Sequence, residues 1–371
     1  MAQRYIRVEP PYGGLDDLLR EEGEKTLFLV CDEALRFLRL KAYFDTLETR
    51  LGIRAVTFSD FAPNPAYESV VKGVVAFRAA GTRLILAVGG GSAMDVAKCI
   101  KLYADMDPER NYLEQEIRPN DVRLMALPTT AGTGSEATRF AVIYYKGEKQ
   151  SVAHESCIPA TVLFAPDTLE TLPAYQRKST LLDALSHAVE SFWSVNSTPE
   201  SRDFAREAIR AIREHLHAYL VNEEKGNEGM LRAANLAGRA INITQTTAGH
   251  AMCYKLTSLY RLAHGHAAAL CNKALFPWLA AHPERCIDPR GEAYLRRTME
   301  ELDAALGCAS TEEAAARFGQ LVDSMALPAP AAKAEDLPVL CRGVNPVRLK
   351  NFPARLEGED IEELYREILG L

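Results

Sequence analysis

Four side chains able to bind a metal ion occur in the second half of the sequence. Asp183 and His187 are four residues apart in a helix-like stretch, LLDALSHAVESFW, and share one face of it. Their neighbours are apolar nearly all round, which predicts a buried helix and a cationic partner for Asp183. His250 begins another helical stretch, and His264 precedes a glycine. One Asp and three His suit a divalent first-row metal such as Fe²⁺ or Zn²⁺, although each histidine alone is more simply explained as a core or surface residue.

A second group of residues has the composition of a phosphate-binding turn. Gly89, Gly90, Gly91 and Ser92 follow a strand-like run and precede a helical stretch. Glycines let the backbone approach a phosphate, and a helix N-terminus supplies free N–H donors. Asp95 comes three residues after Ser92, as in a capping box. The spacing is neither GxGxxG nor that of a Walker loop, so a tight strand–helix connection is an alternative interpretation.

Two further polar features accompany this turn. The segment 128–136, PTTAGTGSE, follows the next predicted strand and carries four hydroxyls and two glycines. It is able to line a cofactor with neutral donors, or it is a solvated loop. Asp32 ends the first predicted strand, where a carboxylate binds a ribose 2′-hydroxyl and repels a 2′-phosphate. A surface turn residue is an equally good interpretation of Asp32.

The elements that must position these residues follow two different patterns. In the first half, apolar runs that indicate buried strands alternate with helical stretches, which predicts a parallel sheet covered by helices. The predicted strands are 25–31, 55–58, 83–88 and 123–127, and the helical stretches are 33–51, 67–79 and 93–103. From residue 180 onward the pattern is helical, over 180–195, 200–221, 229–243, 250–259, 292–306, 312–325 and 360–369. We therefore expect an α/β nucleotide-binding domain over residues 1–168 and an all-α metal-binding domain over residues 169–371.

Composition excludes several classes of protein. The chain has 371 residues, 47% of them hydrophobic and 25% charged, which excludes disorder as the dominant state. A net charge of −7 disfavours nonspecific binding to nucleic acid. The longest apolar stretches are too short or too interrupted to span a membrane, and no signal peptide is recognisable. Eight cysteines without a CxxC pair indicate reduced thiols, so we expect a cytoplasmic protein.

Four motifs in a shared order resemble the iron-containing (group III) alcohol dehydrogenase family. They are GGGSAMDVAK, PTTAGTGSE, the DALSHAVE helix and the HAM…HG segment, and the similarity runs from the first strand to about residue 350. The resemblance implies a nucleotide-binding α/β domain and a helical domain with the active site in the cleft between them, as in dehydroquinate synthase-like folds.

The resemblance also implies roles for individual residues. It identifies the metal ligands as Asp183, His187, His250 and His264. It identifies cofactor contacts at Asp32, Asn64, Gly89, Gly90, Gly91, Ser92, Asp95, Thr129, Thr130, Thr133 and Lys149. Within that set Asp32 favours NAD(H), while NADP(H) stays open.

The sequence departs from the family pattern beside the metal site. The family commonly has HAMAH, whereas this chain has HAMCY, so Tyr254 stands one turn after His250 where a histidine often serves in proton transfer. We therefore take Tyr254 and His264 as the catalytic candidates. Other details resemble the phosphonoacetaldehyde reductase branch, whose dianionic substrate requires fixed cations. Arg139, Lys255 and His266 are the substrate-binding candidates, and surface charges are the alternative for the first two.

We expect a metal-dependent NAD(P)H oxidoreductase that reduces a small aldehyde, and phosphonoacetaldehyde fits best. A general short-chain alcohol or lactaldehyde dehydrogenase is one alternative, and a reductase of another phosphonate carbonyl, such as phosphonopyruvate, is a second. A third, of a different class, is an NAD-dependent cyclase or lyase of the dehydroquinate synthase type. The expected partners are a small-molecule substrate and further copies of the chain, in a homodimer or a higher homo-oligomer.

Overall fold

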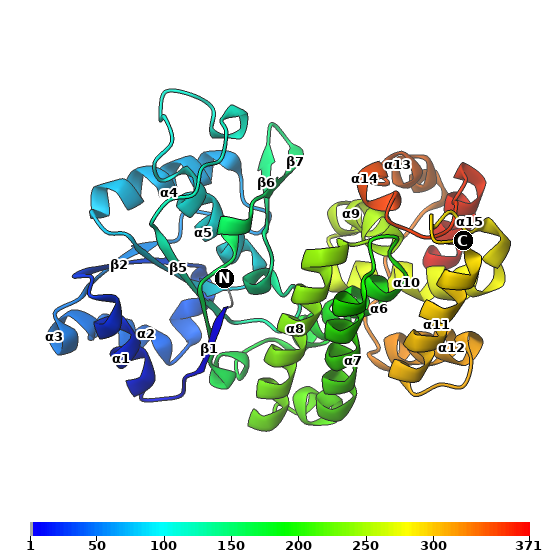
Figure 1. Cartoon of the computed structure of the whole chain (residues 1–371), viewed down its shortest axis with the longest axis horizontal. Coiled ribbons are helices and arrows are strands. Elements are labelled where there is room, and N and C mark those ends of the chain that lie inside the picture. The colour runs from blue at the N-terminus through cyan, green and yellow to red at the C-terminus, as the bar shows by residue number, and fades with distance from the viewer. Residues whose placement is uncertain (1–2) are drawn as a thin grey trace. The chain divides into compact units, whose positions relative to one another are not determined.

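The computed structural model describes residues 3–371, which form two compact units (Figure 1). The first unit comprises residues 3–172 together with Val221–Leu231. The second comprises Pro173–Leu220 and Arg232–Leu371. The return of Val221–Leu231 to the first unit is a feature that the sequence did not predict.

A parallel sheet of six strands forms the centre of the first unit, which confirms the predicted α/β class. Across the sheet the strands are β1 (Arg4–Arg7), β8 (Thr161–Phe164), β5 (Arg123–Pro128), β4 (Leu84–Gly89), β2 (Thr26–Cys31) and β3 (Arg54–Phe58). Every neighbouring pair is parallel. The register sets Gly89 opposite Pro128, so the chain leaves β4 and β5 at adjacent points of one sheet edge.

Helices cover both faces of this sheet, because its strands are apolar on both sides. Within β2, Phe28 packs into one core and Leu29 into the other. The helices that complete the first of these cores are α4 (Tyr67–Ala80) and α5 (Gly91–Tyr103). The second core includes residues of α1 (Gly13–Glu22), α2 (Leu40–Asp45) and α3 (Leu47–Leu51). An antiparallel hairpin of β6 (Phe140–Tyr145) and β7 (Glu148–Ala153) also packs on the α4–α5 side.

The second unit is helical, as predicted. Its helices are α6 (Ala174–Trp193), α7 (Pro199–Leu220), α9 (Ala248–Tyr260), α10 (His264–Ala281), α11 (Glu292–Leu306), α12 (Thr311–Ser324), α13 (Leu337–Arg342), α14 (Pro346–Leu349) and α15 (Gly358–Leu369). The helix α8 (Glu224–Thr244) begins in the first unit and ends in the second. Helix α6 is buried continuously from Leu181 to Trp193, in agreement with its apolar surroundings in the sequence.

Helices α6 and α10 approach each other closely where α10 begins. A Cβ atom on Gly265 would lie 2.1 Å from the carbonyl oxygen of Ser179 and 2.5 Å from Cβ of Asp183. Only glycine permits this approach, and it brings His264 and Asp183 into the same region of the unit. In the part of the chain that the structure describes, no helix has both the length and the apolar character that a bilayer crossing requires.

Several elements differ from the prediction. The stretch 33–51 is not one helix: a 3₁₀ turn over Glu33–Phe37 ends at Leu38, whose backbone is extended, and α2 and α3 follow. The buried side chains of Leu35, Leu38 and Leu40 all pack into the core beneath, so tertiary packing overrides the helical period. The strands β1, β6, β7 and β8 and the helices α1, α10, α13 and α14 were not predicted.

Candidate metal centre and cofactor site

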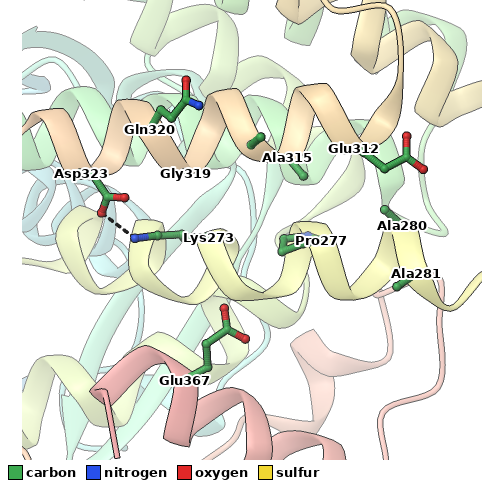
Figure 2. A pocket seen from close by; sticks show the side chains of 11 residues that line it. Lys273, Pro277, Ala280, Ala281, Glu312, Ala315, Gly319, Gln320, Asp323 and Glu367 are labelled. Atoms are coloured by element: carbon green, nitrogen blue, oxygen red, sulfur yellow. Dashed lines mark hydrogen bonds and ion pairs between the residues drawn. The ribbon is translucent and has the colours of Figure 1, made fainter.

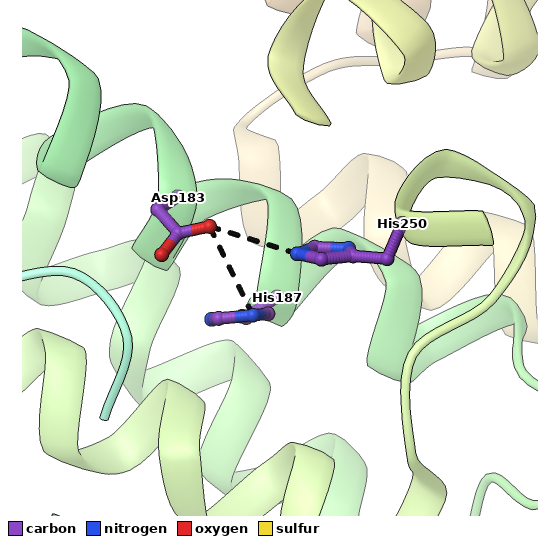
Figure 3. Close-up of side chains that lie close together, drawn as sticks. All are labelled: Asp183, His187 and His250. Atoms are coloured by element: carbon purple, nitrogen blue, oxygen red, sulfur yellow. Dashed lines mark ion pairs between the residues drawn. The ribbon is translucent and has the colours of Figure 1, made fainter. Parts of the chain in front are cut away.

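Helices α6 and α9 bring three of the four predicted ligands together in the second unit. Figure 3 shows Asp183 and His187 on α6 facing His250 on α9. Oδ1 of Asp183 lies 3.6 Å from Nε2 of His250 and 3.9 Å from Nε2 of His187. All three side chains are buried, and the two imidazole rings are stacked with centroids 4.6 Å apart. The arrangement directs one carboxylate oxygen and two ring nitrogens at a common point.

The donor atoms of this cluster fit a divalent metal ion. Neither Oδ1 of Asp183 nor Nε2 of His250 has a hydrogen-bond partner among residues 3–371, although both are buried. Metal bonds of about 2.0–2.2 Å place neighbouring ligand atoms about 3–4 Å apart, which matches the two separations above. A cation between them would satisfy two buried polar atoms that otherwise carry a desolvation cost.

Electrostatics favour the ionised carboxylate at this point. Burial alone would raise the pKa of Asp183, but the surrounding His187, His250 and His264 hold that pKa well below its usual value. Because a carboxylate binds metal in its ionised form, Asp183 is prepared to accept a cation over the ordinary pH range.

The fourth predicted ligand, His264, is the first residue of α10. Its ring centroid lies 5.2 Å from that of His250, and Nδ1 lies 3.7 Å from the thiol sulfur of Cys253. Tyr254 stacks on the same ring, with centroids 5.8 Å apart and planes inclined by only 12°. Both catalytic candidates are therefore adjacent to the cluster of Asp183, His187 and His250.

Glu190 is a buried carboxylate of this region that the sequence analysis did not single out. It lies on the face of α6 that carries Asp183 and His187, and it accepts a hydrogen bond from Nδ1 of His250 at 2.5 Å. Burial opposes its ionisation, but His250 and the hydrogen-bond donors around it hold the pKa of Glu190 at about 2. The spacing i, i+4, i+7 in a helix predicted to be buried was the sequence signal for it.

In the first unit, the sheet edge brings the two predicted cofactor segments together. Thr129 donates its backbone N–H to the carbonyl of Gly89 at 3.0 Å. A Cβ on Gly90 would touch Thr130 at 3.4 Å, and a Cβ on Gly91 would meet Thr133 at 3.2 Å. The glycine turn and the PTTAGT segment thus pack against each other at the start of α5.

The capping-box interpretation of Ser92 and Asp95 is wrong. Helix α5 has Gly90 at its N-cap, with no side-chain cap. The carboxylate of Asp95 instead points inward, where it accepts hydrogen bonds from the hydroxyl of Ser135 at 2.9 Å and the backbone N–H of Val142 at 3.1 Å. Burial raises the pKa of Asp95 despite these contacts. In the structure, Asp95 therefore links α5 to the PTTAGTGSE segment and to β6 through buried hydrogen bonds.

Lys98 is part of the same buried tie, one turn further along α5. Its ammonium group donates to the carbonyl oxygens of Ser135 and Phe140 at 2.6 and 2.7 Å and to the hydroxyl of Thr138 at 3.2 Å. Desolvation lowers the pKa of this lysine, while Asp95 opposes that shift. The segment after β5 is therefore fixed to α5 by buried polar contacts, which the sequence did not reveal.

The remaining cofactor candidates lie on the first unit as well. Asp32 accepts the backbone N–H of Ala34 at 3.0 Å, and a Cβ on Gly89 would lie 3.0 Å from its other oxygen. The carboxylate is thus placed beside the glycine turn. Asn64 is exposed, and its backbone φ is 59°. Lys149 lies opposite Tyr144 in the β6–β7 hairpin, and its positive charge acts to lower the pKa of Asp95.

The three substrate candidates have different surroundings. Arg139 forms an ion pair with the exposed Glu155 at 2.9 Å. The stem of Lys255 packs against Gly343, where an added Cβ would lie 3.0 Å from it. His266 is buried, and its Nδ1 forms a hydrogen bond of 3.1 Å with the hydroxyl of Tyr175, which accepts the N–H of Ala263. Desolvation by burial lowers the pKa of His266.

A surface groove elsewhere in the second unit has a volume of about 550 Å³. It runs between α10 and α12, with Ala315 and Gly319 of α12 among its lining residues and the ion pair of Lys273 with Asp323 at one end (Figure 2). No residue that the sequence analysis proposed for a site lines this groove.

Comparison with family models identifies both halves of the chain. Residues 3–166 match a model described as iron-containing alcohol dehydrogenase. Residues 178–369 match a model described as Fe-containing alcohol dehydrogenase family, C-terminal.

Individual relatives agree with these matches. The chain is 33% identical over 305 residues to the phosphonoacetaldehyde reductase of Streptomyces viridochromogenes, covering 78% of this chain and 77% of that protein. It is 34% identical to the 1,3-propanediol dehydrogenase of Citrobacter freundii, over 72% of this chain and 71% of that protein. Among solved structures, an iron-containing alcohol dehydrogenase from Thermotoga maritima superposes with a TM-score of 0.80 at 26% identity, over 100% of this chain and 99% of that one.

Proposed function

Because the chain belongs to the iron-containing alcohol dehydrogenase family, we propose that it is a metal-dependent, NAD(H)-linked reductase of phosphonoacetaldehyde, which it converts to 2-hydroxyethylphosphonate. Membership of the family makes it an oxidoreductase of alcohols or aldehydes and removes the support for a cyclase or lyase. The observation that carries the proposed chemistry is the convergence of Asp183, His187 and His250 on one point.

In the second unit, we assign Asp183, His187, His250 and His264 as the ligands of Fe²⁺ or Zn²⁺. When bound, a divalent ion supplies Lewis acidity that polarises the aldehyde carbonyl. The chain itself supplies one negative charge and three imidazoles, and it buries Asp183, His187 and His250, which reduces the screening of the developing charge by water. The ring of Tyr254 is stacked on that of His264, and its hydroxyl is the proposed donor of the proton that completes the alcohol.

In the first unit, we assign the cofactor to the edge where β2, β4 and β5 end. NAD(H), when bound, supplies the hydride. The backbone of Gly89–Ser92 and the N-terminus of α5 would hold its pyrophosphate, and Thr129, Thr130 and Thr133 would line it with neutral donors. Asn64, Asp95 and Lys149 complete the proposed contacts, and Asp32 would bind the ribose hydroxyls and favour NAD(H) over NADP(H).

A phosphonate substrate is supported by the similarity to the phosphonoacetaldehyde reductase and by two cationic side chains. Arg139 offers a planar guanidinium, which forms an ion pair with the exposed Glu155. Lys255 offers an ammonium five residues after His250 on α9. A neutral short-chain substrate is the second candidate, favoured by the 34% identity to a 1,3-propanediol dehydrogenase.

An NADH-oxidation assay with a panel of carbonyl compounds tests the substrate. We expect kcat/KM for phosphonoacetaldehyde to exceed those for propanal and lactaldehyde by about 100-fold, since two charge-assisted contacts are each worth about 1.5 kcal/mol or more. Phosphonopyruvate in the panel distinguishes the other phosphonate carbonyl. Equal rates across the panel would remove the anionic substrate and leave the neutral alternative.

A variant at Arg139 identifies the residue that binds the anion. Arg139→Met should lower kcat/KM for phosphonoacetaldehyde about tenfold or more while changing that for propanal little. Arg118→Met is the matched control, because Arg118 also pairs with a neighbouring acid, Glu116, on the surface of the first unit. An equal loss on both substrates would contradict the assignment.

A further inference from the structure

Glu190 contacts the proposed metal centre only through another side chain. Its carboxylate lies behind His250, 2.5 Å from Nδ1, while Nε2 of that imidazole lies 3.6 Å from the carboxylate oxygen of Asp183. The two ring nitrogens of His250 therefore serve different partners. An imidazole that donates its Nδ1 hydrogen to a carboxylate keeps its Nε2 lone pair free for a metal.

Four donors converge on this one carboxylate and fix its position. Oε1 receives the ring N–H of His250 and the amide N–H of Asn272, at 2.5 and 2.9 Å. Oε2 receives the backbone N–H and the hydroxyl of Thr247, at 2.5 and 2.7 Å. Thr247 is the N-cap of α9, so the carboxylate also lies at the positive end of that helix dipole. A fully buried carboxylate with both oxygens satisfied is a rigid acceptor.

The backbone of α9 passes very close to the carboxylate of Glu190. A Cβ on Gly249, the residue before His250, would lie 2.6 Å from Oε1 of Glu190 and 2.1 Å from Oδ1 of Asn272. The first turn of α9 therefore approaches α6 and α10 at a distance that only glycine allows. Trp193 donates its indole N–H to the hydroxyl of Thr247 at 2.9 Å, which holds that donor in place.

We propose that Glu190 is a positioning residue of the metal centre, which fixes the tautomer and the ring orientation of His250 so that Nε2 faces the ion. Asn272 and Thr247 hold the carboxylate in turn. This inference rests on the metal centre of the proposed function. Glu190 touches neither ion nor substrate, and it acts through the ligand alone.

The substitution Glu190→Gln tests this role with little change in volume. A glutamine has one acceptor oxygen and one donor nitrogen, so it satisfies either the donors at Oε1 or those at Oε2 and opposes the other pair. We expect the affinity for Co²⁺ or Zn²⁺ to fall about 10- to 100-fold, as is typical when the partner of a metal-bound histidine is removed. The measurement is competition with a chromophoric chelator, and the visible spectrum of the Co²⁺ form reports the change in coordination.

The matched control is Asp303→Asn, an equivalent change at a buried carboxylate of α11 that accepts a hydrogen bond from Thr311. It should keep the wild-type metal affinity even if its metal-free unfolding temperature falls. Loss of stability without loss of affinity in Glu190→Gln would overturn the positioning role.

A second variant covers the case in which Glu190→Gln does not fold. Asn272→Ala removes one donor from the carboxylate and leaves every proposed ligand intact, so we expect a several-fold weaker affinity for the same metals. Unchanged affinity in this variant would overturn the inference. Failure of the wild-type protein to bind Co²⁺ or Zn²⁺ would instead overturn the metal centre itself, so the two failures are distinguishable.

Discussion

At the scale of the residue, one side chain often has a structural task that coexists with its proposed function. Asp32 accepts the N–H of Ala34 and so begins the 3₁₀ turn after β2, and its second oxygen lies beside the glycine turn. The sequence placed this carboxylate correctly at a strand end but left a turn residue and a ribose contact as equal alternatives. The structure supports the first task directly, and the second needs a variant that separates the two.

Asp32→Ser separates them, because a serine hydroxyl keeps the cap and the negative charge is lost. We expect the ratio of kcat/KM with NADPH to that with NADH to rise roughly tenfold, about 1.4 kcal/mol, as repulsion of the 2′-phosphate is removed. The measurement is steady-state kinetics with both cofactors. Asp17→Ser, at an exposed carboxylate of α1, is the control and should leave the ratio unchanged. The same ratio in both variants would show that Asp32 does not select the cofactor.

At the scale of the element, buried strands and amphipathic helices were predictable, and irregular or uniformly apolar elements were not. Strand β4 reads as a continuous apolar run because it is buried on both faces. Edge strand β1 is largely exposed and carries two arginines in four residues, so it lacks that pattern. Helix α10 is apolar on most sides and has no helical period, so only its apolar length was visible.

The candidate site followed the same division. Asp183 and His187 were recognisable because their spacing is local to one helix. The tie of Asp95 and Lys98 to the segment after β5 joins residues about 40 positions apart, and no local pattern encodes it. Glu190 was identified by its burial together with its hydrogen bond to His250, and only the structure shows that hydrogen bond.

The crossing of α6 and α10 gives a prediction at this scale. Gly265→Ala should destabilise the protein by about 1–3 kcal/mol, because the new Cβ would overlap the backbone of Ser179 and the side chain of Asp183. Metal affinity should fall with it. Denaturant unfolding and chelator competition measure the two effects.

Gly358→Ala is the matched control, since Gly358 also lies in the first turn of a helix of the second unit and an added Cβ there meets nothing within 4 Å. It should leave stability unchanged or slightly raised, in line with the helix propensity of alanine. Equal stability of the two variants would mean that the helices adjust at no cost.

At the scale of the whole molecule, the proposed metal ligands all lie in one unit, so bound metal should stabilise that unit. They come from α6, α9 and α10, all in the second unit, whereas the cofactor segments lie in the first. An ion at 100 times its Kd adds about 2.7 kcal/mol to the stability of the state that binds it. Bound metal should therefore hold these three helices together and stabilise the second unit.

Removing the metal with a chelator should lower the unfolding temperature while the affinity for NADH changes less than about twofold. Thermal unfolding by circular dichroism and NADH fluorescence titration, with and without the chelator, measure the two effects. Readdition of Zn²⁺ is the control and should restore the transition. An unfolding temperature that changes neither on chelation nor on readdition of Zn²⁺ would contradict a metal ion held by these helices.

The segment Val221–Leu231 has a consequence for how the molecule is made. It belongs to the first unit, where Glu224 pairs with Arg7 of β1 at 2.7 Å, yet it is synthesised after Pro173–Leu220 of the second. A ribosome releases the chain in order, so the first unit lacks its last piece until residue 231 has emerged, when α6 and α7 have already been translated. Synthesis of the first unit is therefore completed only after part of the second has been made, unlike in chains built from successive domains.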